Sequence, residues 1–417
     1  MNILVSGSGG REHALVQFLQ KNDQIEIIYC APGNGGTAGE AKCRNVPLSD
    51  PLDLADFAAK NNVGLAIAGS EELLVAGIAD LFKEKGIAIL GPGKKAAMLE
   101  GSKCFSKDFM QKYGIRTASY KNFTNFNEAD SWLNKCPYPT VVKADGLAAG
   151  KGVLICQNRE EAKEGLRKLM VDRQFGNAGS SIVIEEYLEG VEASILSFFD
   201  GKTILPLLSA KDHKKIGENE SGPNTGGMGV VSPNPHVNPE IMKKFKEGIL
   251  APTLRGLIEE ELTFTGIIFF GLMITDRGVY LLEYNLRMGD PETQAVLSLL
   301  DSDLLELIQA SVKGTLDTIT PRWKEGAACC VVLASGGYPA SCTKGYEISG
   351  IDKAECSVYI AGARLENEKL LTSGGRVLNV VAIGSTMEEA RRTAYSNVER
   401  ISFKDKVYRR DIGGPVL

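Results

Sequence analysis

Short apolar runs alternate with amphipathic stretches along the first hundred residues. The stretch at about 12–20 has helical periodicity and lies between the first two apolar runs. Short apolar strands that alternate with amphipathic helices indicate a parallel sheet with helices on both faces. We therefore predict a doubly wound domain over 1–101. Its strands are expected at 3–5, 25–29, 65–68 and 87–90.

The pattern changes after residue 101. A helix is expected over 102–113, and Pro137 and Pro139 interrupt the chain before a strand at 140–143. A further apolar strand at 180–186 ends in acidic residues. The apolar pattern restarts at about Ala327, so we place a last domain at 327–417 and a central domain at 102–326.

The segment 279–294 runs from an apolar strand directly into acidic, amide and guanidinium side chains. Because strand side chains alternate, Glu283 and Asn285 are expected on one face. A carboxylate and an amide oxygen suit magnesium, which takes its other ligands from water and phosphate. Arg287 and Asp290 follow in a turn, together with Glu292. A solvated strand end with ordinary surface charges is the alternative interpretation.

Two glycine-rich loops follow the first two strands, at 6–12 and 32–37. The first joins a strand to a helix, so its backbone amides and the helix dipole favour an anion. It matches a dinucleotide fingerprint only loosely, because Glu12 stands where the third glycine would be. A substrate phosphate or carboxylate, a cofactor, and a purely structural turn all remain open. Both loops should face the sheet edge where open α/β sheets bind ligands.

The segment 143–153 combines small residues with Lys143 and Lys151. Its glycines allow a close approach to phosphates, which the two lysines would neutralise. It is not a Walker loop, because Gly152 stands where that motif has Ser or Thr. A β-hairpin turn with two surface lysines is the alternative. Together with Glu283 and Asn285, the segment predicts a nucleotide clamp with magnesium.

Composition narrows the function classes. The 417 residues are 43% hydrophobic and 24% charged, with a formal net charge of −5, so a broad nucleic-acid-binding surface is not expected. No run approaches the ~18 apolar residues that span a membrane, and the start lacks a signal-peptide pattern, which predicts a cytoplasmic protein. Nine cysteines without paired spacing predict reduced thiols, and three histidines leave oxygen atoms as the expected metal ligands.

Taken together, the motifs resemble the glycinamide ribonucleotide synthetase (phosphoribosylamine–glycine ligase) family, which belongs to the ATP-grasp superfamily. The resemblance covers essentially the whole chain. Any one of the matching stretches is weak, but their number and order are specific. They are 9–15, 32–34, 101–103, 143–153, 212–214, 222–229, 289–294, 374–378 and 410–413.

The resemblance implies an α/β and α+β multidomain protein: an N-terminal doubly wound parallel-sheet domain, a central ATP-grasp fold and a small C-terminal α/β domain. A lid subdomain is implied at about 118–190. ATP would lie between two antiparallel sheets. The implied ATP-binding residues are Lys103, Lys143, Gly150, Lys151, Gly152, Glu185, Glu186, Tyr187, Leu188 and Glu192.

The resemblance also implies that Glu283 and Asn285 hold Mg²⁺ or Mn²⁺. The residues implied on the glycine and phosphoribosylamine side are Gly9, Gly10, Asn34, Gly35, Asp212, Asn224, Thr225, Gly226, Arg287 and Asp290, with Arg287, Lys143 and Asp212 catalytic. Three places depart from the family pattern, which puts only local substrate contacts in doubt. They are 70–73, Lys211 and Met288.

The implied reaction is the ATP-dependent ligation of glycine to 5-phosphoribosylamine through glycyl phosphate, in purine biosynthesis. The expected partners are these small molecules, with transient contacts to neighbouring purine-pathway enzymes, and neither nucleic acid nor membrane. His213 beside Asp212 could serve as a base or be positional, so we do not assign it a catalytic role. Two other classes stay open: a dinucleotide-binding oxidoreductase, argued from the first turn, and a nucleotide-sensing module without turnover.

Overall fold

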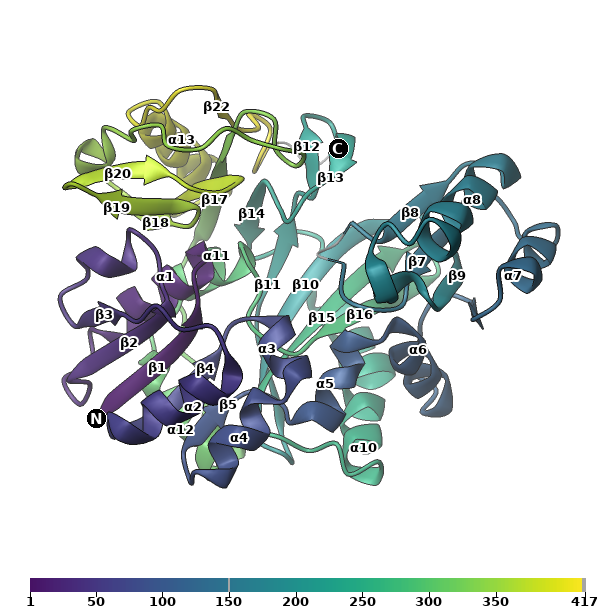
Figure 1. Cartoon of the computed structure of the whole chain (residues 1–417), viewed down its shortest axis with the longest axis horizontal. Helices are drawn as coiled ribbons and strands as arrows, with labels where there is room; N and C mark the ends of the chain where they lie inside the picture. The colour runs from purple at the N-terminus through teal and green to yellow at the C-terminus, as the bar shows by residue number, and fades with distance from the viewer. Residues whose placement is uncertain (149–150, 415–417) are drawn as a thin grey trace.

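The computed structural model of the chain describes residues 1–148 and 151–414. Its N-terminal part is a parallel sheet with strand order β3-β2-β1-β4-β5 (Figure 1). Ile3 and Val5 pack in one core with Leu15, whereas Leu4 packs in a second core with Leu54. Both faces of the sheet are therefore covered, as the apolar runs predict. The strands are β1 Asn2–Gly7, β2 Ile27–Pro32, β3 Cys43–Asn45, β4 Val63–Ala68 and β5 Ala88–Leu90.

The helices of this part begin where the sequence supplies caps. Asp50 accepts hydrogen bonds from the first amides of α2, and Ser102 accepts one at the start of α6. The predicted helix at about 12–20 is present as α1, two residues earlier, and the one predicted over 102–113 is α6. The helices are α1 Gly10–Leu19, α2 Pro51–Lys60, α3 Glu71–Ala76, α4 Ile78–Glu84, α5 Lys94–Gly101 and α6 Lys103–Lys112.

A separate antiparallel sheet of order β6-β9-β7-β8 projects to the right in Figure 1. Strands β7 and β8 pair antiparallel with Lys143 opposite Val153, so the predicted segment 143–153 begins on β7 and ends on β8. Gly150 lies outside the described residues. The elements are β6 Tyr120–Phe123, α7 Phe126–Leu133, β7 Thr140–Ala144, β8 Val153–Cys156, α8 Arg159–Leu166 and β9 Ile182–Glu186.

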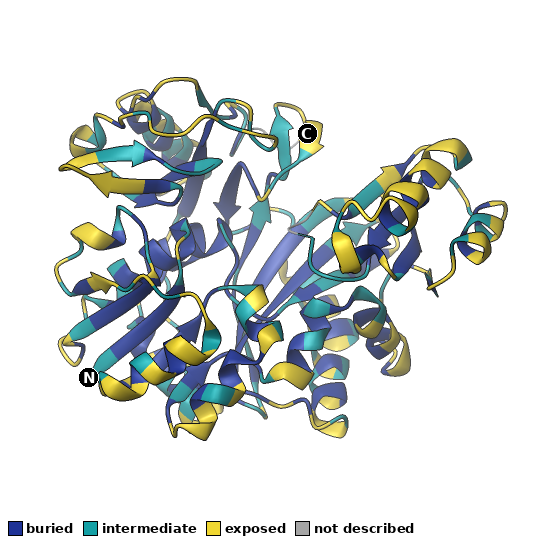
Figure 2. Cartoon of the chain, viewed as in Figure 1, coloured by how far each residue is buried: buried dark blue, intermediate teal, exposed yellow. Residues whose placement is uncertain are grey.

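The largest sheet is antiparallel and runs β16-β15-β10-β11-β14-β17-β21-β18, with β22 paired to β17. Its β-rich centre is buried, as the dark strands in Figure 2 show. The strands are β10 Val191–Phe199, β11 Ile204–Asp212, β14 Gly229–Ser232, β15 Gly266–Thr275, β16 Gly278–Asn285, β17 Ala327–Ser335, β18 Ser357–Ile360, β21 Arg376–Gly384 and β22 Lys406–Val407.

This sheet continues into the C-terminal part. The strand predicted from Ala327 is β17, and it pairs with β14, which places Val331 opposite Gly229. The last part is thus an α/β unit added to the central sheet, while the predicted domain bounds at 101 and 326 stay predictions. The remaining elements are β12 Lys215–Gly217, β13 Ser221–Asn224, α9 Pro239–Phe245, α10 Ala251–Glu259, α11 Glu292–Ser298, α12 Leu304–Lys313, β19 Ala363–Glu366, β20 Lys369–Thr372 and α13 Met387–Val398.

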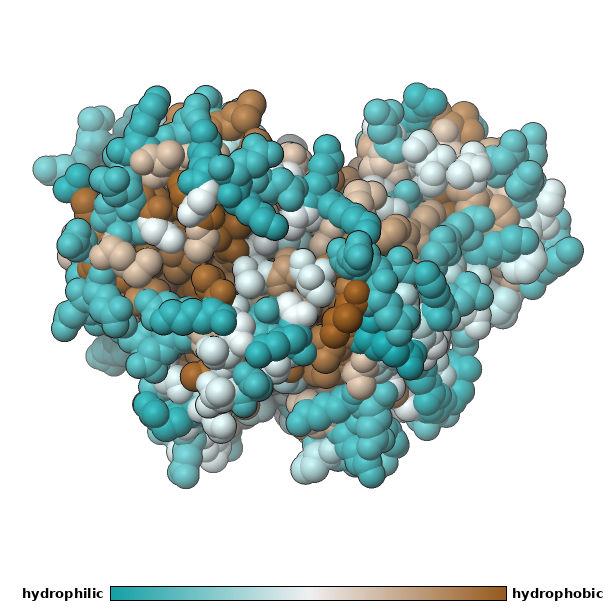
Figure 3. All heavy atoms as spheres, turned by 90° about the horizontal axis from the view of Figure 1, so that it is seen from below, coloured by the Kyte–Doolittle hydropathy of each residue, from teal (hydrophilic) through white to brown (hydrophobic). Residues whose placement is uncertain are grey.

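Polar side chains cover most of the face in Figure 3, where hydrophobic residues gather mainly in the left half and in a narrow central streak. Among the described residues, no helix is both long and apolar enough to cross a membrane. All nine cysteines are free thiols, as their spacing predicts.

Candidate functional site

A buried carboxylate lies between two lysines where the β6-β9-β7-β8 sheet, called the lid sheet below, meets α6. Glu185, on β9, is 3% exposed, and its two oxygens lie 2.7 Å from Lys107 Nζ and 2.5 Å from Lys143 Nζ. Burial alone would raise the pKa of Glu185, but the two lysine charges outweigh it and the net shift is downward. Lys103, at the start of α6, lines the same small pocket as Lys143 and Glu283. The structure thus brings these three predicted residues together.

The end of β16 supplies the predicted oxygen pair. Glu283 is opposite Gly271 and Asn285 is opposite Phe269, two positions apart on the strand. The register shifts between these pairs and the Leu281–Leu272 pair, so the strand is not regular throughout. Despite burial, the charges of lysines 214, 103 and 143 hold the pKa of Glu283 at about 2, so this carboxylate is ionised.

The oxygen pair fits magnesium better than a metal held by protein alone. The described residues contain no cluster of three His, Cys, Asp or Glu side chains that could hold a metal. Within the described ranges, nothing donates a hydrogen bond to the Glu283 carboxylate, while Asn285 Oδ1 accepts one from Arg287 Nη2 at 3.1 Å. One ionised carboxylate and one amide oxygen suit an ion that takes its other ligands from water and phosphate.

Sequence reasoning missed Lys214. Its Nζ lies 2.8 Å from Glu192 Oε2. Burial would lower the pKa of Lys214, but the charges of Glu192, Glu283 and Asp212 raise it overall. This lysine therefore lies near the residues predicted to bind ribose (Glu192), metal (Glu283) and substrate (Asp212). Two signals could have found it: it stands in the matching stretch 212–214, and it lies two residues after Asp212, which predicts a shared face on an extended segment.

The predicted adenine segment is split between buried and exposed residues. Leu188 is buried, whereas Tyr187 is exposed. Glu186 pairs with Arg277 at 2.7 Å and lines a pocket with Tyr187 and Tyr138. Lys151 does not join the lysine cluster, because its Nζ donates to the Pro339 carbonyl oxygen at 3.5 Å.

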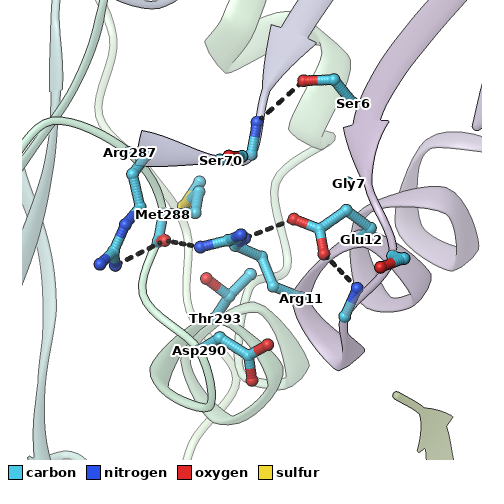
Figure 4. A network of polar contacts seen from close by, with 12 residues as sticks. Ser6, Gly7, Arg11, Glu12, Ser70, Arg287, Met288, Asp290 and Thr293 are labelled. Carbon is cyan, nitrogen blue, oxygen red and sulfur yellow. Dashed lines mark hydrogen bonds and ion pairs between the residues drawn. The ribbon is translucent and has the colours of Figure 1, made fainter. Parts of the chain in front are cut away.

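Two arginines meet at one backbone carbonyl beside the first turn (Figure 4). Met288 O accepts from Arg11 Nη1 at 2.9 Å and from Arg287 Nη1 at 3.2 Å. Arg287 also lies 3.5 Å from Glu71 and 3.2 Å from Glu100. The departures from the family pattern at 70–73 and Met288 therefore fall on this cluster. For Met288 the contact is made by the backbone, so a change of its side chain leaves it in place.

The side chain of Glu12 fills the space inside the first glycine turn. Glu12 is 1% exposed, its Oε2 accepts from Gly9 N at 2.6 Å, and its Oε1 lies 2.5 Å from Arg11 Nε. A Cβ on Gly7 would lie 2.6 Å from Glu12 Cδ. Since a dinucleotide pyrophosphate would need this space, the geometry disfavours the oxidoreductase alternative.

The predicted loop residues are packed against other parts of the chain. Asn34 Nδ2 donates to the carbonyls of Ser8, Gly9 and Ile360, and its Oδ1 accepts from Gly36 and Thr37. The Asn34 side chain is therefore fully engaged in joining the first turn to β18. Gly35 N donates to Ala363 O, and a Cβ on Gly10 would lie 2.2 Å from Asn379 Nδ2.

Arg376, on β21, contacts several residues predicted on the glycine and phosphoribosylamine side, which we call the acceptor side. Its Nη1 donates to the carbonyls of Asp290, at 2.8 Å, and Gly226, and its Nη2 lies 3.6 Å from Asp290 Oδ1. Thr225 Oγ1 donates to Lys214 O at 2.8 Å, and Asn224 is opposite Lys215 in the β12–β13 pair. Sequence reasoning missed Arg376 as a site residue, although it stands in one of the matching stretches.

Buried charges on this side are unequally neutralised. Burial would raise the pKa of Asp290, but Arg376 and Arg11 lower it overall. Burial, and then the charge of Glu292, raise the pKa of Asp212. His213 is buried, and mainly because of that burial its pKa falls to about 4; its Nδ1 contacts Gly229 O at 3.2 Å. A neutral, buried histidine fits a positional role.

Comparison with known proteins gives matches over the whole chain. Three family models match: the N domain of phosphoribosylglycinamide synthetase at 1–100, its ATP-grasp (A) domain at 101–293 and its C domain at 328–415. A phosphoribosylamine–glycine ligase of Clostridium acetobutylicum is 57% identical over 413 residues, covering 99% of both chains. One of Fusobacterium nucleatum is 52% identical over 418 residues, covering 99% of this chain and 98% of the relative.

Solved structures agree with these matches. The crystal structure of a phosphoribosylamine–glycine ligase from Thermotoga maritima superposes with a TM-score of 0.88 at 35% identity, covering 99% of this chain and all of that one. The biotin carboxylase domain of a 2-oxoglutarate carboxylase from Hydrogenobacter thermophilus gives a TM-score of 0.75 at 16% identity, covering 97% and 91% of the two chains. At that identity, the second likeness shows the fold alone.

Proposed function

This chain belongs to the phosphoribosylglycinamide synthetase family of ATP-grasp ligases, and we propose that it ligates glycine to 5-phosphoribosylamine in purine biosynthesis. The products would be glycinamide ribonucleotide, ADP and phosphate. The observation that carries the proposal is the position of Glu283. It lies at a strand end among lysines from α6, the lid hairpin and the loop after β11, next to an acceptor side of mixed charge.

ATP would bind between the lid sheet and the end of β16. Backbone groups of the segment from Glu185 to Leu188 would hold adenine, and Glu192 would hold the ribose. Lys103 and Lys143 would contact the phosphates, under a lid loop that includes Lys151 and Gly152, with Gly150 beyond the described residues. Lysines suit this task because their compact charges can leave a carboxylate and re-pair with phosphate.

Mg²⁺, or Mn²⁺ in its place, would be held by Glu283 and Asn285. When bound, the ion neutralises phosphate charge and orients the γ-phosphate. The lysines around Glu283 add positive charge at the same place. Phosphoryl transfer needs mainly alignment and charge neutralisation, which groups held in place before the reaction supply.

The reaction needs an activated glycine carboxyl group, and we propose glycyl phosphate as the intermediate. A glycine carboxylate oxygen would attack the γ-phosphorus, and ADP would leave. The amine of phosphoribosylamine would then attack the acyl carbon, so that phosphate leaves and the amide forms. Arg287 would stabilise the developing negative charge, and its hydrogen bonds to Met288 O and Asn285 Oδ1, which fix the guanidinium, support this role.

Phosphoribosylamine would bind near Gly9, Gly10 and the loop of Asn34 and Gly35. The side chain of Asn34 is engaged within the protein, so this loop would contribute backbone groups. Asp290 and the turn from Asn224 to Gly226 would border the same space. A cytoplasmic location and transient contacts with neighbouring purine-pathway enzymes stay predictions.

The test is release of ADP and phosphate by the purified protein, with phosphoribosylamine generated in the assay. Release that requires both glycine and phosphoribosylamine is the expected result. ATP binding without turnover would favour the sensor alternative. ADP and phosphate release at the same rate with and without glycine would overturn glycine as the proposed substrate.

A further inference from the structure

One carboxylate from the N-terminal part reaches the strand end that carries the predicted metal pair. Glu100 lies near the end of α5, which packs on β16, and only 7% of this residue is exposed. Strand β16 ends at Asn285, and the backbone amide of the next residue, Leu286, donates to Glu100 Oε2 at 2.6 Å. The carboxylate thus supplies an acceptor at the point where the strand stops.

The other oxygen of Glu100 faces the guanidinium of Arg287. Arg287 Nε lies 3.2 Å from Glu100 Oε1, and Arg287 Nη2 donates to Asn285 Oδ1 at 3.1 Å. One carboxylate therefore contacts both the peptide that follows Asn285 and the side chain that holds the Asn285 amide. An amide oxygen has two lone pairs, so Asn285 Oδ1 can accept from Arg287 and still face an ion.

Stability alone does not account for this buried pair of charges. Taking two charges out of water costs free energy, and an apolar pair of similar volume is often as stable or more so. Orientation is a sufficient reason, because removing a group that holds a metal ligand in place typically costs roughly ten- to a hundredfold in metal affinity or activity. Glu100 also lines the same small pocket as Glu283 and Lys103, so it lies beside the groups that it would orient.

We propose that Glu100 is a positioning residue for the metal pair. It sets the orientation of Asn285 and Arg287, and through them the ability of the site to hold Mg²⁺. This inference rests on the proposed function. Because Glu100 lies on a helix of the N-terminal part, it ties the metal pair of the central sheet to the part of the chain that is proposed to seat phosphoribosylamine.

The first measurement is binding without turnover. Isothermal titration calorimetry gives the affinity for an ATP analogue with nitrogen between the β- and γ-phosphorus, once with magnesium and once with EDTA. The ratio of the two affinities is the gain from magnesium. In Glu100→Gln, which keeps the size but removes the charge, we expect this gain to fall about tenfold or more, with an affinity in EDTA close to that of the wild type.

Glu100→Asp separates placement from charge. Aspartate keeps the charge, but it is one methylene shorter and cannot reach both the Leu286 amide and Arg287. It should therefore show a loss like that of Glu100→Gln, and it carries the test if the first variant does not fold, as judged by circular dichroism. A wild-type gain from magnesium in Glu100→Asp would mean that charge alone matters, and would overturn the positioning role.

The same substitution in an Asn285→Ala background shows whether Glu100 acts through Asn285. If it does, Glu100→Gln costs little more in the double variant, because its route to the metal is already lost. A full additional loss would contradict the proposal. Glu260→Gln is the matched control and should leave the gain unchanged. Glu260 also joins two helix ends, since it pairs with Lys112 and accepts from Tyr113 Oη at 2.8 Å.

Turnover separates this inference from the proposed function. In Glu100→Gln, kcat should fall and the magnesium concentration for half-maximal activity should rise. A lower kcat with an unchanged magnesium requirement would indicate a structural role and overturn the proposal. Failure of the wild type to release ADP with glycine and phosphoribosylamine would instead overturn the proposed function, while the binding measurements would still decide the role of Glu100.

Discussion

The two sides of the site neutralise buried charge by different means. On the ATP side, lysines surround the carboxylates: Glu185 lies between Lys107 and Lys143, and Lys214 pairs with Glu192. On the acceptor side, arginines have this role: Arg287 pairs with Glu100 at 3.2 Å and also donates to the backbone carbonyl of Met288. A lysine ammonium can exchange a carboxylate for a phosphate, whereas an arginine held by several hydrogen bonds stays in place. The comparison suggests an ATP side that rearranges when ligand binds and an acceptor side that is formed beforehand.

The largest effect is expected from Glu283→Gln, which removes the ionised carboxylate at the centre of the ATP side. We expect kcat to fall roughly a hundredfold or more, the usual cost of losing one transition-state-stabilising group. The circular dichroism spectrum should stay that of the folded wild type, although the unfolding temperature should fall, because the charges of Lys214, Lys103 and Lys143 stabilise the ionised carboxylate. Steady-state ADP release over a magnesium titration checks it, and near-normal kcat at saturating magnesium would refute the metal assignment.

Lys214→Met comes next, because it asks whether the lysine between Glu192 and Glu283 is needed for ATP. Loss of a charge-assisted contact should lower kcat/KM for ATP roughly ten- to a hundredfold. The matched control is Lys215→Met, which removes the adjacent lysine, whose side chain forms no ion pair within the described part of the chain. Equal effects of the two substitutions would show that Lys214 acts only through general charge.

Arg376→Lys tests whether the acceptor side depends on fixed geometry. Lysine keeps the charge but cannot hold Asp290 O and Gly226 O with one planar group. We expect kcat/KM for glycine and phosphoribosylamine to fall about tenfold with an unchanged KM for ATP. A change confined to ATP would contradict the division of the site into two sides.

The same contrast shows which parts of the fold and of the site could be predicted from the sequence. Apolar periodicity predicts the N-terminal sheet, and the strand end at Glu283 and Asn285 predicts the metal pair, because both are local patterns. Arg376 and Lys214 could not be assigned in this way, since their roles depend on strands that meet only through the β11–β14–β17–β21 order. The short strand β3 was also missed, as three residues carry too little pattern.

The smallest effect concerns His213, which lies beside Asp212 but is held in a neutral state by burial. Its pKa is about 4 in the folded protein against 6.5 for the free side chain, so the unfolded chain binds more protons between these values. Stability should therefore fall as the pH drops below about 6.5 and change little above it. Between pH 7.5 and 5.5 we expect a loss of about 1 kcal/mol. Denaturant unfolding of the wild type and of His213→Gln at both values isolates this contribution from the other titrating groups. An identical pH dependence in the two proteins would mean that His213 takes up its proton without cost, and that the boundary between the two sides is open to water.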